Sequence, residues 1–262
     1  MSFSLAIIRS DGYDGEMALS ATQLERHKRH ILLKEIGGPG VQKLRRAKVS
    51  IIGAGALGGP CALYLAAAGV GQIEIWDDDQ VDLSNLQRQI QFSEADIGAD
   101  KASVLGSRLT ALYPELDIAV HQRRFLKDDA LAGSILIDAT DNFETRFVLN
   151  RVAHESGRIL VSGAASRWTG QVSVYASGLE RDVPCYQCFV PETPPEAEAC
   201  DDVGVVGALT GMIGSRMALE AVKLITGAGV PLIGRLLIID GLTGESRTLK
   251  LRPNPDCPVC ST

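Results

Sequence analysis

The sequence has 262 residues, of which 45% are hydrophobic and 22% are charged, and its formal net charge is −6. These values are typical of a globular chain that is long enough to bury a sizeable core. An acidic balance does not suit nucleic acid, which needs a basic face, so we expect no such partner. No stretch is typical of a signal peptide, and the most apolar segment, Val203 to Thr226, contains three charged residues. We therefore expect a cytoplasmic protein without a membrane span.

The first predicted element is a helix. We expect residues 1–18 to form a flexible tail. From Ala21 to Ile36 the apolar residues recur with a loose helical period, and Gly37 to Gly40 contains the glycines and the proline expected at a helix end. A βαβ unit is predicted next, with its strand, helix and second strand at Lys48 to Gly53, Leu57 to Ala68 and Gln72 to Asp77.

The alternation of helices and strands continues through the middle of the chain. The predicted order is helix, strand, strand, helix and strand, at Lys101 to Leu112, Leu116 to Val120, Ser134 to Ala139, Glu144 to Glu155 and Arg158 to Ser162. Such alternation is typical of an α/β fold. We predict a Rossmann-like, doubly wound, mostly parallel sheet with helices on both faces.

The pattern changes after Gly170. Gln171 to Ala176 alternates as a strand does, whereas Val183 to Asp202 is an irregular insertion rich in proline and glutamate, with three cysteines. A helix from Val206 to Ile225 and two strands, at Arg235 to Asp240 and Ser246 to Leu251, complete the pattern. We expect these strands to close the sheet as an antiparallel pair. No linker separates two units, so we predict a single domain over residues 1–262.

The stretch IIGAGALGGP places Gly53, Gly55 and Gly58 at the G-x-G-x-x-G spacing, between a predicted strand and a helix. These glycines allow a tight turn, a close approach of the backbone to phosphate, and close packing of the helix on the strand. An acidic residue at the end of the next strand, here Asp77, is well placed to bind ribose hydroxyls. NAD and ATP both fit these features.

A polar run after the second strand favours ATP. It contains Asn85, Gln87, Arg88 and Gln89, and Lys101 opens the next predicted helix. Fixed cations near the phosphates stabilise the negative charge that builds on a departing pyrophosphate. A further strand ends in DATDN, and Asp141 there is a natural Mg²⁺ ligand beside a triphosphate, while Asp138 is predicted to be structural.

The combination of GAGALGG, D-x-D with SNLQRQ, Lys101, TDN, a Cys-x-x-Cys pair and a terminal CPVC resembles the MoeB/ThiF/HesA adenylyltransferases, which are ubiquitin-activating-enzyme-like. The resemblance runs from about Arg26 to Cys260. Members of this family use ATP and Mg²⁺ to adenylate the C-terminal glycine of a ubiquitin-like sulfur-carrier protein ending in Gly-Gly, and they release pyrophosphate. The resemblance also implies a sulfur donor, either a sulfurtransferase or a cysteine desulfurase.

The resemblance implies roles for individual residues. The glycines Gly53, Gly55 and Gly58 would hold phosphate, Asp77 the ribose, and Asp79 the ribose or the metal. Mg²⁺ would be held by Asp141. The remaining implied contacts to the nucleotide are Asn85, Arg88, Gln89, Lys101 and Asn142. The residues implied to be catalytic are Arg88, Lys101, Asp141 and Cys200. Arg29 matches an arginine that reaches into the ATP site of the other subunit, which implies a homodimer.

Two pairs of cysteines have the spacing of zinc knuckles. They are Cys185 with Cys188 and Cys257 with Cys260. Four thiolates complete a tetrahedral Zn²⁺ site with no open position, so we predict a structural zinc ion that ties the irregular insertion to the C-terminal segment. A redox dithiol is the alternative for either pair taken alone.

The two remaining cysteines have different surroundings. Cys200 matches a position at which related thiamine-pathway enzymes bond covalently to the carrier's sulfur, although its acidic neighbours, including Glu198 and Asp201, disfavour a thiolate. Cys61, in the first turn after the glycine loop, is predicted to be a packing residue.

Two other classes of function remain as rivals. An NAD(P)-dependent oxidoreductase is favoured only by the glycine loop, and a nucleotide-binding scaffold would use ATP and zinc structurally. Among carriers, the segment from Gly234 through Arg252 to CPVC resembles the molybdopterin-synthase branch slightly more than the thiamine branch. A cyclic threonylcarbamoyladenosine-forming relative is a more distant alternative.

Overall fold

A mixed β-sheet forms the centre of the fold. The computed structural model describes residues 18–193 and 203–261. Within them the sheet has eight strands in the order β3-β2-β1-β4-β5-β6-β7-β8. The strands are β1 (Lys48–Ile52), β2 (Gln72–Trp76), β3 (Asp117–His121), β4 (Ile135–Asp138), β5 (Ile159–Ser166), β6 (Thr169–Tyr175), β7 (Arg235–Asp240) and β8 (Ser246–Lys250). The first five strands are mutually parallel, and β6, β7 and β8 extend the sheet by antiparallel pairing. The predicted fold class is confirmed.

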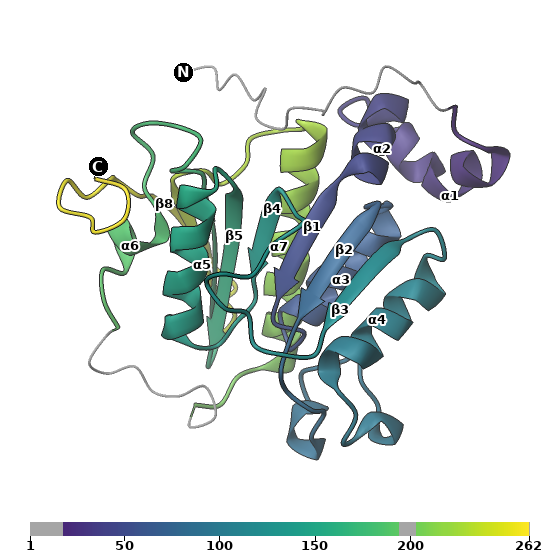
Figure 1. The fold of residues 1–262 in the computed structure, drawn as a ribbon, viewed down its shortest axis with the longest axis horizontal. Helices are drawn as coiled ribbons and strands as arrows, with labels where there is room; N and C mark the ends of the chain where they lie inside the picture. The colour runs from purple at the N-terminus through teal and green to yellow at the C-terminus, as the bar shows by residue number, and fades with distance from the viewer. Residues whose placement is uncertain (1–17, 194–202, 262) are drawn as a thin grey trace.

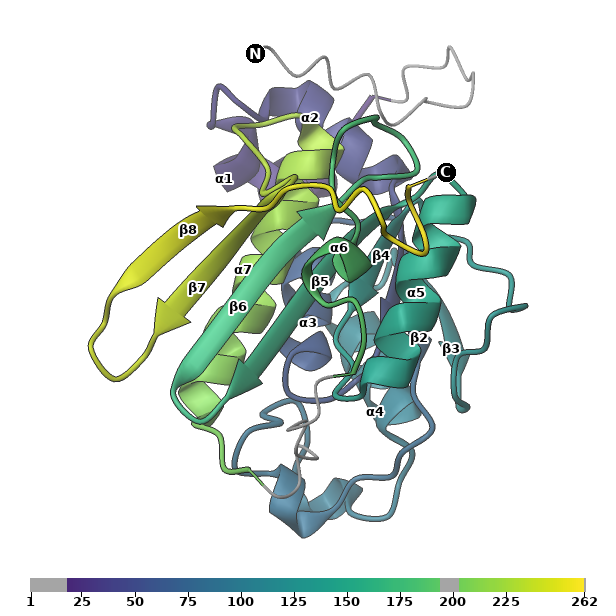
Figure 2. The ribbon, with the colours of Figure 1, turned by 90° about the vertical axis from the view of Figure 1, so that its left-hand side faces the viewer.

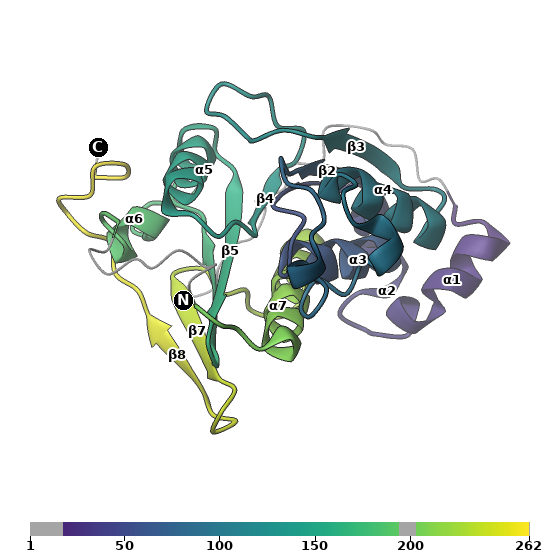
Figure 3. The same cartoon turned by 90° about the horizontal axis from the view of Figure 1, so that it is seen from below.

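Helices cover both faces of the sheet (Figure 1). They are α1 (Ala21–Ile31), α2 (Gly37–Arg46), α3 (Gly58–Ala68), α4 (Lys101–Leu112), α5 (Phe143–Glu155), α6 (Tyr186–Phe189) and α7 (Gly207–Thr226), with two short 3₁₀ turns at Leu83–Asn85 and Glu94–Asp96. Helices α3, α4 and α7 share one hydrophobic cluster with the sheet, while α5 and α6 contribute to a second cluster on the opposite face (Figure 3). None of the described helices is long and apolar enough to cross a membrane.

The central strands are buried because they are covered on both faces. Almost every residue of β1, β2 and β4 is buried, as expected for parallel strands that lie between two layers of helices. Strand β1 pairs with β2 on one side and with β4 on the other. The chain order therefore reverses direction at β1, and in α/β sheets ligands bind beyond the carboxyl ends of the strands at such a point.

The N-terminal segment forms two helices where the sequence predicts one. Helix α1 ends at Ile31, and α2 begins at Gly37, so the Gly37 to Gly40 stretch opens a helix instead of ending one. Gly37 has a φ of 57°, in the left-handed region that glycine favours. Pro39 is tolerated in the first helical turn because the N–H groups there have no intrahelical acceptor. The prediction of a single helix over 21–36 is therefore wrong.

The hairpin formed by β5 and β6 is longer than the sequence predicts. Strand β5 continues to Ser166 and turns directly into β6 at Thr169. The extension contains Gly163 and two alanines, which have low strand propensity and so give little signal. Helix α7 explains the small residues, because a Cβ atom on Gly163 would collide with the Met217 sulfur.

After β8, the C-terminal segment returns to the face of the sheet that is covered by α5 and α6. Strands β7 and β8 lie side by side beyond β6, and the chain after β8 runs back toward α6 (Figure 2). Both pairs of cysteines meet there, which brings the described part of the insertion beside the C-terminal segment. Most of the predicted tail, residues 1–17, and Cys200 lie outside the described residues.

Candidate functional site

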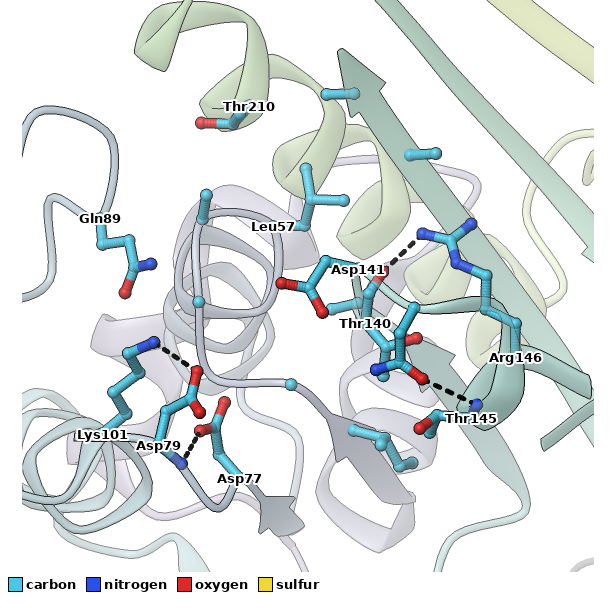
Figure 4. Close-up of a pocket in the computed structure, with 18 of the residues that line it drawn as sticks. Leu57, Asp77, Asp79, Gln89, Lys101, Thr140, Asp141, Thr145, Arg146 and Thr210 are labelled. Carbon is cyan, nitrogen blue, oxygen red and sulfur yellow. Dashed lines mark hydrogen bonds and ion pairs between the residues drawn. The ribbon is translucent and has the colours of Figure 1, made fainter. Parts of the chain in front are cut away.

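A pocket lies beyond the carboxyl ends of β1, β2 and β4, at the point where the chain order reverses (Figure 4). Its lining comes from the glycine loop, the segments after β2 and β4, the start of α4, and the strand β5. The charged and amide side chains that line it are Asp77, Asp78, Asp79, Arg88, Gln89, Lys101, Arg124, Asp141, Asn142 and Arg146. The site predicted from the sequence is thus assembled largely from residues that the fold brings together.

The three glycines of the loop have different surroundings. Gly53 has a φ of 98°, and a Cβ atom there would lie 2.6 Å from the Ala139 carbonyl oxygen. A Cβ atom on Gly58 would overlap the carbonyl oxygen of Gly53. Gly55, in contrast, faces the pocket, and a Cβ atom there would meet only the Gln89 amide, at 3.6 Å. Two glycines are therefore required by close packing, and one leaves space for a ligand.

Asp77 caps the glycine loop as well as lining the pocket. Its Oδ2 atom accepts a hydrogen bond from the Ala54 N–H at 2.6 Å, and Oδ1 accepts one from the Asp79 N–H at 2.9 Å. Burial raises the pKa of this carboxyl group, and the two backbone N–H donors and the Lys101 charge oppose the rise. The carboxylate therefore fixes the loop before any ligand is bound.

Lys101 and Asp79 form an ion pair inside the pocket. The Lys101 Nζ atom lies 2.8 Å from Asp79 Oδ2, and the Lys101 side chain is only 8% exposed. The Lys101 backbone N–H also donates to the Asp79 carbonyl oxygen at 3.0 Å. The Arg88 Nη1 atom donates to the Ser84 carbonyl oxygen at 3.0 Å. The lysine is thus held at the first residue of α4 with its charge inside the pocket.

The aspartates after β4 differ in exposure. Asp138 is fully buried, and its two oxygens accept hydrogen bonds from the Thr140 and Ser162 hydroxyls at 2.7 and 2.6 Å. Asp141 is exposed and directs its carboxylate into the pocket (Figure 4). Asn142 is the N-cap of α5, where its Oδ1 atom accepts a hydrogen bond from the Thr145 N–H at 2.9 Å. The structural assignment of Asp138 agrees with this arrangement, and Asp141 is the aspartate available to the pocket.

Some predicted residues do not line this pocket. Gly58 lies beneath the loop, and the Asn85 Oδ1 atom accepts a hydrogen bond from the Asp82 N–H at 3.2 Å. Arg29 is exposed on α1. Helices α1 and α2 precede β1 and lie near the amino ends of the strands, away from the pocket (Figure 1). The same chain therefore does not bring Arg29 to its own pocket.

Other lining or supporting residues were missed by the sequence analysis. The Gln91 Nε2 atom donates to the carbonyl oxygens of Ala54 and Gly55 at 2.8 and 3.0 Å, and so holds the glycine loop. Arg124 and Thr210 reach the pocket from distant segments. Gln91 follows the SNLQRQ string by two residues, which was an available signal, but the other two carry no local motif.

The four cysteines converge beside α5, close to Asn150. Their sulfur atoms all lie within 4.8 Å of one another. The Cys185–Cys257, Cys188–Cys260 and Cys185–Cys188 sulfur distances are 3.5, 3.3 and 4.0 Å. Disulfide sulfurs are about 2 Å apart, whereas four sulfurs at about 2.3 Å from a tetrahedral Zn²⁺ ion lie about 3.8 Å apart. The cluster therefore fits a tetrahedral metal site and contains no disulfide.

Comparisons with known proteins place this geometry in a family. The model of the ThiF family matches residues 27–259. The chain belongs to the ThiF family. Curated relatives of similar length agree with this result. The sulfur carrier protein adenylyltransferase of Thermus thermophilus is 40% identical, over 93% of this chain and 93% of that protein. The SAMP-activating enzyme E1 of Haloferax volcanii is 41% identical, over 93% and 91%.

A longer relative and a solved structure extend the comparison. The adenylyltransferase and sulfurtransferase MOCS3 of Anopheles gambiae is 43% identical over 93% of this ThiF family chain. The chain spans 56% of the length of that relative. The structure of Escherichia coli MccB with MccA-N7isoASN superposes with a TM-score of 0.80 at 21% identity, over 91% of this chain and 75% of that one. The structural likeness supports the fold, and the sequence relatives support the family.

Proposed function

We propose that this chain uses ATP to adenylate the C-terminal glycine of a ubiquitin-like sulfur-carrier protein and releases pyrophosphate. The observation that carries the proposal is one pocket that combines the glycine loop, the Lys101–Asp79 ion pair, and the Asp141 carboxylate. Two relatives of similar length are named as an adenylyltransferase of a sulfur carrier and as an activating enzyme. Both names agree with the proposal.

We assign ATP to the open side of the glycine loop. The Gly55 backbone would approach the phosphates, and Asp77 the ribose hydroxyls. Asp79, Gln89 and Asn142 would complete the polar lining. Gln89 is 5% exposed, and its Oε1 atom has no hydrogen-bond partner in the described part of the chain, so a donor group of the ligand would satisfy it.

The cationic residues act on the phosphates in this proposal. Arg88 and Lys101, assisted by the Asn85 amide, would bind the triphosphate and stabilise the charge that develops on the departing pyrophosphate. Asp79 holds Lys101 until phosphate oxygens compete for the ammonium group. Asp141 would hold Mg²⁺, which screens the charges of neighbouring phosphate oxygens. An exposed carboxylate directed into the pocket fits that role.

The reaction is a substitution at phosphorus. An oxygen of the carrier's terminal carboxylate forms a bond to the α-phosphorus, and the bond from that phosphorus to the bridging oxygen breaks, so that pyrophosphate leaves. A carboxylate nucleophile is already ionised near pH 7 and needs no general base. The protein's contribution is therefore positioning and charge stabilisation. The resulting acyl-adenylate is available to a sulfur donor, either a sulfurtransferase or a cysteine desulfurase.

The wider architecture is also proposed. The chain acts as a single domain in the cytoplasm, with structural Zn²⁺ on Cys185, Cys188, Cys257 and Cys260. The homodimer would bring Arg29 from the partner's α1 to the ATP site. Cys200 is retained as a candidate for covalent attachment of the carrier's sulfur. The molybdopterin carrier is favoured by the C-terminal segment, and the thiamine carrier is the alternative.

Carrier-dependent exchange of pyrophosphate into ATP tests the proposal. Both candidate carriers, purified from the same organism, are added separately to the zinc-loaded chain with Mg²⁺. We expect exchange with the molybdopterin carrier, and loss of exchange when its terminal Gly-Gly is deleted. Exchange with the thiamine carrier alone would move the assignment to that pathway. Absence of exchange with both carriers would contradict the proposed reaction.

Thermal unfolding separates the rival functions. ATP with Mg²⁺ should raise the unfolding temperature, because a ligand that binds only the native state stabilises it according to its occupancy. NAD should leave that temperature unchanged. Protection by NAD alone would favour an oxidoreductase, and ATP protection without carrier-dependent exchange would favour a nucleotide-binding scaffold.

A further inference from the structure

Helix α5 begins at the pocket and passes the cysteine cluster. Its N-cap, Asn142, is adjacent to Asp141, and two buried polar residues, Arg146 and Asn150, follow it at intervals of four positions. Residues spaced by four lie on the same face of a helix, one turn apart. This face therefore carries polar side chains from the pocket toward the cysteines.

Arg146 holds the pocket end of this face. Its Nη2 atom donates to the Thr140 carbonyl oxygen at 2.5 Å and to the Gly163 carbonyl oxygen at 3.0 Å, and only 8% of the residue is exposed. Figure 4 shows the guanidinium group directed at Thr140 beside Asp141. The buried guanidinium therefore fixes the backbone of the segment that carries Asp141.

Asn150 holds the cysteine end. It is 2% exposed, and its Oδ1 atom accepts a hydrogen bond from the Tyr186 N–H at 2.9 Å. Its Nδ2 atom lies 3.5 Å from the Cys185 sulfur and 3.4 Å from Gln187 Oε1. An N–H group that donates to a ligand sulfur orients the ligand and stabilises its thiolate form. The Asn150 amide thus contacts three consecutive residues, Cys185, Tyr186 and Gln187, in the segment that carries the first cysteine pair.

The two ends are connected by short, buried contacts. Four residues of α-helix advance by about 6 Å, so the Arg146 and Asn150 contacts are one turn apart on a rigid element. Moving the segment around Cys185 would leave buried polar groups unpaired or would shift the helix face that positions Thr140, and unpaired buried groups are costly.

We propose that Asn150 and Arg146 are positioning residues that couple metal binding at the four cysteines to nucleotide binding in the pocket. With the cysteines ligated, Cys185 and Tyr186 hold Asn150, and Arg146 on the same face holds the Thr140–Asp141 segment in the position that receives the nucleotide. The inference rests on the proposed nucleotide function of the pocket. Coupling between two sites is reciprocal in binding free energy, so bound nucleotide must also raise the affinity for the metal.

Zinc affinity and nucleotide affinity are the two measurements. The equilibrium distribution of zinc between the full chain and a chelating dye is measured with and without a non-hydrolysable ATP analogue and Mg²⁺, and affinity for the analogue is measured by calorimetry. In the wild-type chain we expect saturating analogue to raise the zinc affinity about fivefold, a typical coupling between sites. This comparison needs no variant, so it is independent of whether any substitution folds.

Three variants locate the coupling. Asn150→Ala should weaken zinc binding about tenfold, as expected for a residue that supports a metal ligand, and should abolish the effect of the analogue on zinc affinity. Asn150→Asp keeps an acceptor for the Tyr186 N–H but places a negative charge beside the Cys185 sulfur, so it should bind zinc more weakly still. Arg151→Ala is the control. Arg151 is the next residue of the helix, its side chain is 41% exposed, and its ion pair is with Glu155 at 3.9 Å.

The outcomes separate this proposal from the proposed function. Equal zinc affinities with and without bound analogue in the wild-type chain would overturn the coupling alone. Weaker zinc binding in Asn150→Ala with an unchanged effect of the analogue would show a purely local role and would overturn it as well. A wild-type chain that binds no ATP analogue would overturn both proposals.

Discussion

At the scale of single residues, the pocket is organised before a ligand enters. Asp77 is bonded to the Ala54 N–H, and Lys101 is paired with Asp79. Such preorganised charges require little rearrangement when a charged transition state forms. The glycines of the loop have two different roles. Gly53 and Gly58 are needed for backbone packing, while Gly55 faces the pocket. Loop stability and ligand binding therefore depend on different residues of one motif.

Two alanine substitutions test this division. Gly58→Ala should destabilise the fold by about 2 kcal/mol or more, because the added methyl group overlaps the Gly53 carbonyl oxygen. Gly55→Ala should change the free energy of unfolding by less than about 0.5 kcal/mol. It should nevertheless weaken ATP binding by about tenfold, or about 1.4 kcal/mol, because the methyl group projects toward the phosphate position. Urea unfolding and calorimetry measure the two effects, and equal loss of stability in both variants would contradict this interpretation.

At the scale of elements, α1 is held against the body of the protein by a buried histidine. His27 is 2% exposed, its ring packs edge-on against Tyr113 at 6.1 Å, and it lies close to Gly69. Its Nε2 atom is buried without a hydrogen-bond partner among the described residues. Burial lowers the pKa of His27, as do the nearby charges of His30, Arg26 and Arg45, while Glu115 opposes the shift. The folded chain, in which α1 is packed against the body of the protein, thus favours the neutral form of the His27 imidazole.

This preference predicts a loss of stability in acid. Because the pKa of His27 is lower in the folded chain than the value of about 6.5 in the unfolded chain, the unfolded state binds more protons below that pH. The free energy of unfolding should therefore fall as the pH drops below about 6.5, by up to about 1.4 kcal/mol per pH unit from this group. Above about pH 7.5, His27 is neutral in both the folded and the unfolded chain, and it no longer contributes to the pH dependence of the free energy of unfolding.

Urea unfolding at pH 7.5 and at pH 5.5 measures this effect. His27→Phe keeps an aromatic ring against Tyr113 but cannot be protonated, so its stability should fall less between the two pH values than that of the wild-type chain. His154→Gln is the control for a histidine that is not fully buried and whose ring contacts Ser177, away from His27. An identical loss in His27→Phe and in the wild-type chain would assign the pH dependence to other groups.

At the scale of the whole molecule, the polar features occupy three separate regions. The pocket lies at the carboxyl ends of the parallel strands, and the cysteine cluster lies beside α5. Helix α1 lies near the amino ends of the strands (Figure 1). Arg29 belongs to the region of α1, so it can contribute to the pocket only through another copy of the chain. A homodimer would supply that copy, and α5 connects the other two regions within one chain.

Complementation between inactive variants tests the shared site. Arg29→Ala and Arg88→Ala should each abolish carrier-dependent exchange while leaving zinc content and folding intact. After subunit exchange, a mixed dimer pairs the intact pocket of the Arg29→Ala chain with Arg29 from the other chain. Random pairing in a two-fold dimer would restore about one quarter of the wild-type activity. Lys28→Ala, a neighbouring exposed change on α1, should remain active, and a mixture no more active than its components would argue against a shared site.

The order of elements and the main motifs were predictable because their signals are local. The βαβ unit around the glycine loop follows from hydrophobic periodicity and from glycine spacing, and the strands and helices from 48 to 155 agree with prediction to within a few residues. Errors arose where local signals were ambiguous. Gly37 to Gly40 contains residues that occur at both ends of helices, and the small residues that extend β5 are explained only by the contact with α7.

The α/β class, the glycine loop, the polar string with Lys101, and the two cysteine pairs were readable from the amino-acid sequence. Each depends on residue types at short spacing, and the chain presents them whatever their partners are. The folded structure was needed to show that Lys101 pairs with Asp79 and that Arg146 and Asn150 lie between the pocket and the cysteines. Those contacts join residues whose meeting depends on strand order and on the packing of α5, and no local pattern contains that information.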